Sequence, residues 1–276
     1  MKLLVSHAFK KPLLSLFALS LLLLFCSQQP PHRKIAQIAL DAYYLTTDNL
    51  GNAYVMTTGH DLNKYKPDGS YSTTQNFKAN GSITSVDVSN TMQINVFYKP
   101  LNKVIILDNV LAFRGELLLR NLGITQATAC ARSFDNGLWV FDASDLLLKK
   151  IDKDLKQVTE QSPNVRLFVE KGKTLAPDFI FDDASRVYVN NPETGILVFD
   201  IFAQYIKTIP VKGLHHFQVI GNELIYFRNN RLQRYNLRSS IQTVLQLPDT
   251  TDLLDARLEK ERLYLLKKNG LTLYAY

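Results

Sequence analysis

The stretch FQVIGNELIYFRNNRLQRYNLRSSIQTVL, residues 217–245, contains four short segments rich in aromatic and β-branched residues. Small or polar residues separate these segments: Gly221-Asn222, Asn229-Asn230 and Arg238-Ser-Ser. Glycine and asparagine tolerate the positive φ that tight hairpin turns require, and serine can hydrogen-bond its own backbone there. The pattern therefore predicts four consecutive antiparallel strands joined by short turns.

The same four-strand unit recurs along the chain, and its second strand aligns best between copies. The six occurrences of this strand are 52–55, 94–97, 138–141, 187–190, 224–227 and 263–266. Their average spacing of about forty residues is the length of one propeller blade. The sequence therefore predicts an all-β protein, a six-bladed β-propeller over residues 34–276.

The last copy is one strand short, because the sequence stops after its third strand at Tyr276. A spare segment, Ile35-Ala-Gln-Ile-Ala-Leu40, precedes the first full copy. We expect this segment to pair with the last blade, which closes the ring and removes an exposed sheet edge. Residues 253–268 are also rich in helix formers, so a helix is the alternative there. The turn signal Asn269-Gly270 favours the hairpin.

The segment Asp48-Asn-Leu-Gly-Asn-Ala-Tyr-Val55 resembles the Asp-x-x-Gly-Asn-x-Tyr-Val segment of NHL-type propeller repeats. Residues 62–69, LNKYKPDG, are similar to the strand and turn that follow in that family. Residues 135–140 and 183–189 are degenerate versions of the first segment, so the first blade matches best. The resemblance implies the fold and gives the Asp and Gly a structural role in the turn, but it implies no particular activity.

The N-terminus has the pattern of a secretory leader over residues 1–26, followed by a polar linker over residues 27–33. Three lysines precede an apolar run over residues 13–25. As a helix this run is about 20 Å long, shorter than a bilayer core of roughly 30 Å. We therefore expect an exported protein of the cell envelope, periplasmic or outer-membrane-associated in a bacterium. An uncleaved membrane anchor is the alternative.

The chain has two cysteines, too few for a disulfide framework once one belongs to a leader. Cys26 lies at the end of the apolar run, a position that resembles the lipidated cysteine of bacterial lipoproteins. Phe25 stands where that motif has a small residue, so the lipidation signal is incomplete. Cys130, between two alanines, is expected to be a small core residue.

The charge pattern argues against a nucleic-acid partner. The formal charge of +7, less the three charges of Lys2, Lys10 and Lys11 in the leader, is +4. The other lysines and arginines are scattered among acidic residues and form no basic stripe that could follow a phosphate backbone.

Polar residues on or beside the expected innermost strands are the candidates for lining a central channel, one from each blade: Asp48, Asp87, Arg132, Asp178, His216 and Asp255. Core strands have little reason to carry charges unless these face water or pair with one another. A structural ring of ion pairs that uses Arg132 is one interpretation. Attraction of a cation or a basic partner side chain is the other.

No motif of known chemistry assigns a catalytic or metal-binding residue. Gly-rich phosphate loops, nucleophile elbows, zinc-protease motifs and Cys-x-x-Cys pairs are missing from the sequence. The adjacent His215-His216 would point to opposite faces of a strand and make a poor metal pair. Asp182-Asp183 is expected to cap a turn, and a calcium site is the alternative. No other cofactor is expected.

These features favour a non-catalytic, exported or membrane-tethered propeller that acts as a protein-interaction or ligand-binding platform. Its partner would be an envelope protein or a small ligand, and it would contact the membrane only through its N-terminus. The alternative is a calcium-dependent enzyme of the lactonase or hydrolase kind, as some similar six-bladed propellers are, with its site in the central channel.

Overall fold

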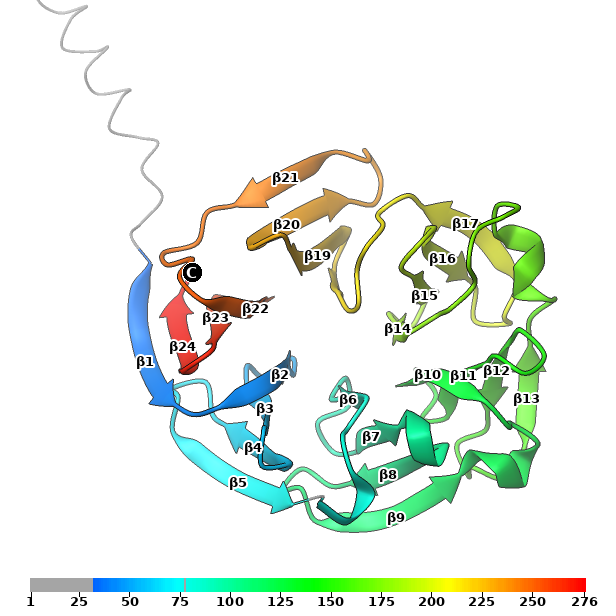
Figure 1. The fold of residues 1–276 in the computed structure, drawn as a ribbon, viewed down its shortest axis with the longest axis horizontal. Coiled ribbons are helices and arrows are strands. Elements are labelled where there is room, and N and C mark those ends of the chain that lie inside the picture. Colours follow the sequence, from blue (N-terminus) through cyan, green and yellow to red (C-terminus); the bar gives the residue numbers. More distant parts are fainter. Residues whose placement is uncertain (1–31, 77) are drawn as a thin grey trace, which may run out of the picture. The chain divides into compact units, whose positions relative to one another are not determined.

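The computed structural model describes residues 32–276 with the exception of residue 77. Lys34–Tyr276 form one compact unit of six four-stranded antiparallel sheets. Figure 1 shows these sheets arranged as blades around a central axis. Within the described part of the chain, no helix is long and apolar enough to cross a membrane. The predicted leader over residues 1–26, with Cys26, lies outside the described residues, as does most of the predicted linker.

Each blade runs from an inner strand beside the axis to an outer strand at the rim (Figure 1). The inner strands are β2 (Ala42–Thr47), β6 (Ser85–Asp87), β10 (Ala127–Arg132), β14 (Phe179–Asp182), β18 (Gln218–Ile220) and β22 (Leu253–Glu259). The second strands are β3 (Ala53–Thr57), β7 (Ile94–Tyr98), β11 (Leu138–Asp142), β15 (Val187–Asn191), β19 (Glu223–Arg228) and β23 (Arg262–Lys267).

The outer half of each blade completes the sheet. The third strands are β4 (Asp61–Tyr65), β8 (Lys103–Leu107), β12 (Leu147–Ile151), β16 (Gly195–Phe199), β20 (Arg231–Asn236) and β24 (Gly270–Ala275). The outer strands are β5 (Tyr71–Asn76), β9 (Phe113–Leu118), β13 (Val158–Gln161), β17 (Tyr205–Ile209), β21 (Gln242–Leu245) and β1 (Arg33–Ala39). Short 3-10 turns occur at η2 (Lys78–Asn80), η3 (Lys99–Leu101), η4 (Leu119–Leu122) and η5 (Val165–Phe168).

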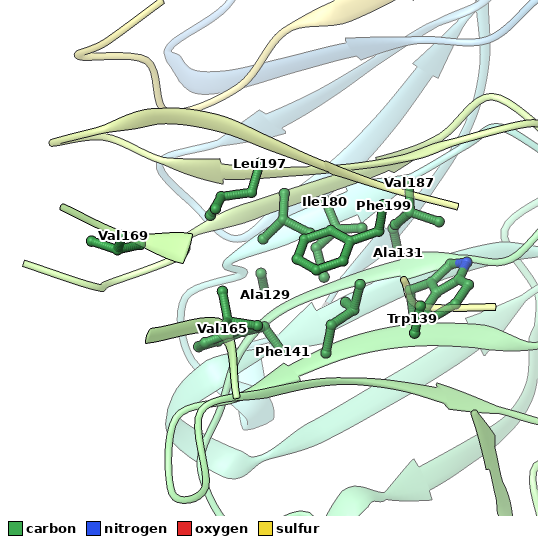
Figure 2. Packing of buried hydrophobic residues seen from close by; sticks show 13 residues of the cluster. Ala129, Ala131, Trp139, Phe141, Val165, Val169, Ile180, Val187, Leu197 and Phe199 are labelled. Carbon is green, nitrogen blue, oxygen red and sulfur yellow. The ribbon is translucent and has the colours of Figure 1, made fainter. Parts of the chain in front are cut away.

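The blades are held together by hydrophobic clusters, and each of the six clusters among the described residues spans two neighbouring blades. Figure 2 shows the cluster between β11 and the next blade, where Trp139 and Phe141 pack near Val187 and Phe199. All four side chains are fully buried. Burying one large apolar side chain contributes about 1.5–3 kcal/mol. Packing between neighbouring blades therefore stabilises each blade.

The structure confirms the predicted fold and its closure. β1 is hydrogen-bonded to β24, so an N-terminal strand completes the last blade. Residues 253–267 form the paired strands β22 and β23, and the helix alternative is wrong. Side chains of these strands, Ala256 and Leu263 among them, pack against blade 5, and this burial outweighs the local helix propensity. Cys130 is a buried free cysteine, and burial raises the pKa of its thiol.

The closing strand also touches the blade that follows it. Gly69, in the turn between β4 and β5, has φ of +83°, a conformation that favours glycine. A Cβ atom added at Gly69 would lie 2.3 Å from the Cβ of Ala36 on β1. The seam between the first and last blades therefore has no room for a side chain at this turn.

This seam gives a test of the closure. Gly69→Ala is expected to lower the free energy of unfolding by about 2–4 kcal/mol, because the unfavourable φ and the collision with Ala36 add together. Gly123→Ala is the matched control, since Gly123 has φ of +74° and open space around it. It should cost only about 1 kcal/mol. Ala36→Gly should recover part of the Gly69→Ala loss in urea unfolding. Equal losses for both glycine variants would contradict the closure contact.

Candidate binding site at the mouth of the central channel

The inner strands run parallel to one another around the axis, and their C-terminal ends surround a cavity of about 360 Å³, called here the channel mouth. Its lining comes from all six blades: Thr47, Asp48, Asn49, Ser89, Arg132, Phe134, Phe181, Asp182, Asp183, Ala184, Gln218, Val219, Ile220, Arg257 and Glu259. A smaller cavity of about 70 Å³ shares four lining residues with the mouth: Thr47, Ser89, Phe181 and Arg257. The two cavities therefore adjoin along the channel.

The six residues predicted to line the channel separate into groups. Asp48 and Arg132 line the mouth, and Asp87 lines the smaller cavity. Asp178, His216 and Asp255 line neither cavity. Asp178 and His216 precede their inner strands, whereas Asp48 and Arg132 lie at the C-terminal ends of theirs. Because the inner strands are parallel, residues before a strand and residues after it lie at opposite ends of the channel.

Asp48 acts mainly within its own turn. Its carboxylate accepts hydrogen bonds from the backbone nitrogens of Leu50 and Asn52, from the side-chain amide of Asn52 and from the Tyr54 hydroxyl, all at 2.8–2.9 Å. This matches the structural role that the NHL-type resemblance implies for the turn Asp. Both carboxylate oxygens of Asp48 are used by its own segment, although the side chain lies at the mouth.

The other end of the channel carries two histidine–aspartate pairs. His215 Nδ1 lies 2.9 Å from a carboxylate oxygen of Asp178, and His216 Nε2 lies 3.6 Å from Asp255. Burial raises the pKa of both carboxyl groups, and the neighbouring histidine opposes that rise in each case. His215 is largely exposed, so its pair with Asp178 belongs to the surface.

The ring of ion pairs around Arg132 does not form. The backbone nitrogen of Arg132 donates to Asp87 over 2.6 Å, while its guanidinium group bonds to Asn136. Within the described part of the chain, no salt bridge joins Arg132 to an acidic residue, and its Nε atom is buried without an acceptor. The physical reason is that turn backbones already occupy carboxylates such as Asp48 and Asp87.

Sequence reasoning missed the charged residues that β22 contributes to the mouth. Arg257 and Glu259 line it, while the intervening Leu258 packs in the hydrophobic cluster against blade 5. The signal was present in the sequence, since alternate residues of a strand point to opposite faces and residues 255, 257 and 259 are all charged. Gln218 was missed as well; its amide bonds to both backbone groups of Leu258 and lies 3.3 Å from Glu259.

Asp182 joins two blades at the mouth. It accepts hydrogen bonds from the backbone nitrogens of Phe134 and Ala184 and from the indole nitrogen of Trp139, at 2.7–3.0 Å. Burial raises the pKa of its carboxyl group, and these donors oppose the rise. The turn role predicted for this residue therefore extends across the boundary between blades 3 and 4.

Glu259 is the mouth residue whose titration is most affected by its surroundings. Burial raises its pKa from 4.5 to about 7, and Asp48 adds to the rise. Arg257, Lys260 and a hydrogen bond from Thr47 act in the opposite direction. The carboxyl group of Glu259 therefore takes up a proton near neutral pH.

The described residues contain no group of three or more His, Cys, Asp or Glu side chains that could hold a metal ion. The three aspartates at the mouth accept hydrogen bonds from the backbone nitrogens of turns: Asp48, Asp182 and Asp183. The mouth also offers two guanidinium groups, two amides, hydroxyls and aromatic side chains. Such an arrangement can bind and orient a polar group.

Comparisons with known proteins identify the fold. Protein-family models give no match, and neither do curated protein sequences. The Neurospora crassa Pan2 WD40 domain matches with a TM-score of 0.62 and 8% identity, covering 90% of this chain and 97% of that chain. Virginiamycin B lyase from Staphylococcus aureus matches with a TM-score of 0.60 and 11% identity, covering 87% of this chain and 98% of that chain. BamB from Moraxella catarrhalis matches with a TM-score of 0.54 and 12% identity, covering 89% of this chain and 100% of that chain. The chain is thus similar to β-propellers at the level of fold.

The raised pKa of Glu259 predicts a pH dependence of stability. Below pH 4.5 the carboxyl group is protonated in both the folded and the unfolded chain. As the pH rises from 4.5 to about 7, the unfolded chain releases this proton first, so the free energy of unfolding falls. Glu259→Gln should remove this contribution, about 1–2 kcal/mol after allowing for solvent screening.

The measurement is urea unfolding of both proteins across this pH range. Glu261→Gln, at an exposed position of the same turn, is the matched control and should keep the wild-type profile. If the wild type and Glu259→Gln differ by the same free energy at every pH, Glu259 does not titrate in this way.

Proposed function

We propose that this chain is a non-catalytic binding platform, exported to the cell envelope by its N-terminal segment, and that partners bind at the channel mouth. The main support is that exposed apolar side chains surround a polar cavity. These side chains lie at the C-terminal ends of four inner strands or in the turns that follow them, and are called here the apolar collar: Leu50, Met92, Phe134 and Ile220. Their exposed fractions lie between 39% and 66%.

The position of the collar supports an interaction surface. Phe134 and Ile220 line the mouth directly, while Leu50 and Met92 lie in the same turns as the lining residues Asn49 and Ser89. Apolar side chains that gather around a recess, with polar groups at its centre, are typical of protein–protein or ligand-binding sites. The blades themselves need no such exposure, because their cores are complete.

A calcium-dependent lactonase or hydrolase remains the competing proposal. Structures similar in fold include the virginiamycin B lyase and a streptogramin B lyase, which are enzymes by name. At 11% and 13% identity this likeness extends only to the fold. Calcium-dependent hydrolysis of a lactone by the purified protein, lost in Asp182→Asn and kept in an exposed variant such as Asp154→Asn, would favour the enzyme over the platform.

Site-specific photo-crosslinking tests the platform. A crosslinking amino acid at Met92 or Ile220 should give an adduct of defined mass in the native host, because both side chains project from the mouth face. Leu101 and Leu167 are matched controls, since they are also exposed and lie in turns at the opposite face. Adducts from the control positions alone, or from none of the four, would contradict the proposal.

Mass spectrometry of the mature N-terminus tests the export route. We expect the protein to be exported, and to be tethered to a membrane through Cys26 if that residue is lipidated after removal of residues 1–25. One acyl chain binds a membrane only marginally, so stable anchoring requires a multiply acylated cysteine. An unmodified peptide that starts at Ser27 or later would exclude the lipid but keep export. An intact Met1 would exclude cleavage of the leader.

A further inference from the structure

The hydrogen bonds at the channel mouth are unequally satisfied. Four acidic residues line the mouth, and the three aspartates each accept three or four hydrogen bonds from their own chain: Asp48, Asp182 and Asp183. The fourth, Glu259, accepts from Thr47 and Gln218, and burial raises its pKa to about 7. The acceptors are therefore largely occupied.

The hydrogen-bond donors at the mouth, by contrast, are only partly used. Arg257 is only 9% exposed and lines both cavities. Its Nε atom donates to the Thr47 hydroxyl over 3.2 Å, and no described residue accepts a hydrogen bond from its two terminal nitrogens. Arg132 lines the same mouth with a buried Nε that lacks an acceptor. A buried guanidinium group with unused N–H groups is costly unless an acceptor reaches it.

These unused donors indicate the chemistry of a group that could bind at the mouth. A guanidinium group presents a planar fork of N–H donors that fits the two oxygens of a carboxylate. The cavity of about 360 Å³ is at the small end of ligand pockets, which are roughly 300–1,000 Å³, so it suits a side chain or a chain terminus better than a large molecule.

The apolar collar decides between a free anion and a polypeptide. A small free anion would contact Arg257 inside the mouth and gain nothing from Leu50 or Met92 outside it. A peptide can place a carboxylate in the mouth while its neighbouring apolar side chains cover the collar. Hydrophobic contact around a central desolvated charge pair is how protein interfaces concentrate their binding energy.

We infer that the channel mouth binds a partner polypeptide through an acidic residue flanked by apolar residues, with Arg257 as the carboxylate-binding residue and the apolar collar as the surrounding contact. This inference rests on the proposed platform function and adds the chemistry of its partner. Arg132 lies beside the same cavity and supplies a second positive charge.

Selection of peptides on the full chain tests the inference. A random peptide library displayed on phage, panned on the purified protein, should yield sequences with one Asp or Glu between apolar residues. Arg257→Gln should weaken binding of a selected peptide roughly tenfold or more, because a desolvated charge pair loses one partner. Arg231→Gln removes the same charge from an exposed position at the start of β20, at the opposite face, and should leave the affinity unchanged.

A change in the peptide makes the test independent of protein folding. Replacing the acidic residue of the selected peptide with its amide should cost as much affinity as Arg257→Gln, and the two changes together should cost little more than either alone. Melting temperatures verify that each protein variant is folded. If Arg257→Gln does not fold, Arg132→Gln and the amide peptide provide the same comparison.

The outcomes distinguish failure of the carboxylate inference from failure of the proposed platform function. If Met92→Ser and Ile220→Ser abolish peptide binding while Arg257→Gln and the amide peptide do not, the platform stands and the carboxylate inference is wrong. If no peptide is enriched, or no mouth variant matters, both are wrong. If inorganic phosphate or acetate displaces the peptide and binds as tightly alone, the mouth is a small-anion site and the polypeptide inference is overturned.

Discussion

The constraint on which this structure depends is that its sheets are apolar on both faces. All five residues of β11 are buried, and the same holds for β7, β15 and β16. A four-stranded sheet cannot cover two apolar faces by itself, so each blade needs a neighbour on each side. All apolar faces are covered only when the last blade packs against the first. β1 supplies the outer strand of the last blade and so completes this closure.

Closure of the ring also creates the candidate site. Thr47 and Arg257 are separated by 210 positions in sequence, yet their side chains are hydrogen-bonded at the mouth. The inner strands all point their C-terminal ends toward the same opening, so the turns that follow them gather there. The site is thus a consequence of the packing between blades, and each blade contributes to it in the same place.

Turn chemistry then determines which charges remain available at the mouth. A hairpin turn after an inner strand exposes backbone N–H groups, and aspartates such as Asp48 and Asp183 satisfy them. These aspartates become acceptors with little remaining capacity. The arginines are less fully paired: Arg132 bonds to Asn136 but keeps a buried Nε without an acceptor, and Arg257 keeps unused terminal nitrogens. A mouth that contains more acids than bases by count is therefore better suited to receive an acceptor than a cation.

The sequence by itself determined the strands, the number of blades, the closing strand and the turn role of Asp48. These features depend on alternation and turn residues within a few positions, so each copy of the repeat carries its own signal. The same local patterns placed one polar residue of each blade near the channel. They could not tell at which end of the channel each residue lies or which residues it contacts. Only the tertiary structure separated Asp178 and His216 from Asp48 and Arg132, and only it brought Arg257, Gln218 and Thr47 together. The physical reason is that these contacts join different blades, and their geometry is fixed by hydrophobic packing that extends around the whole ring.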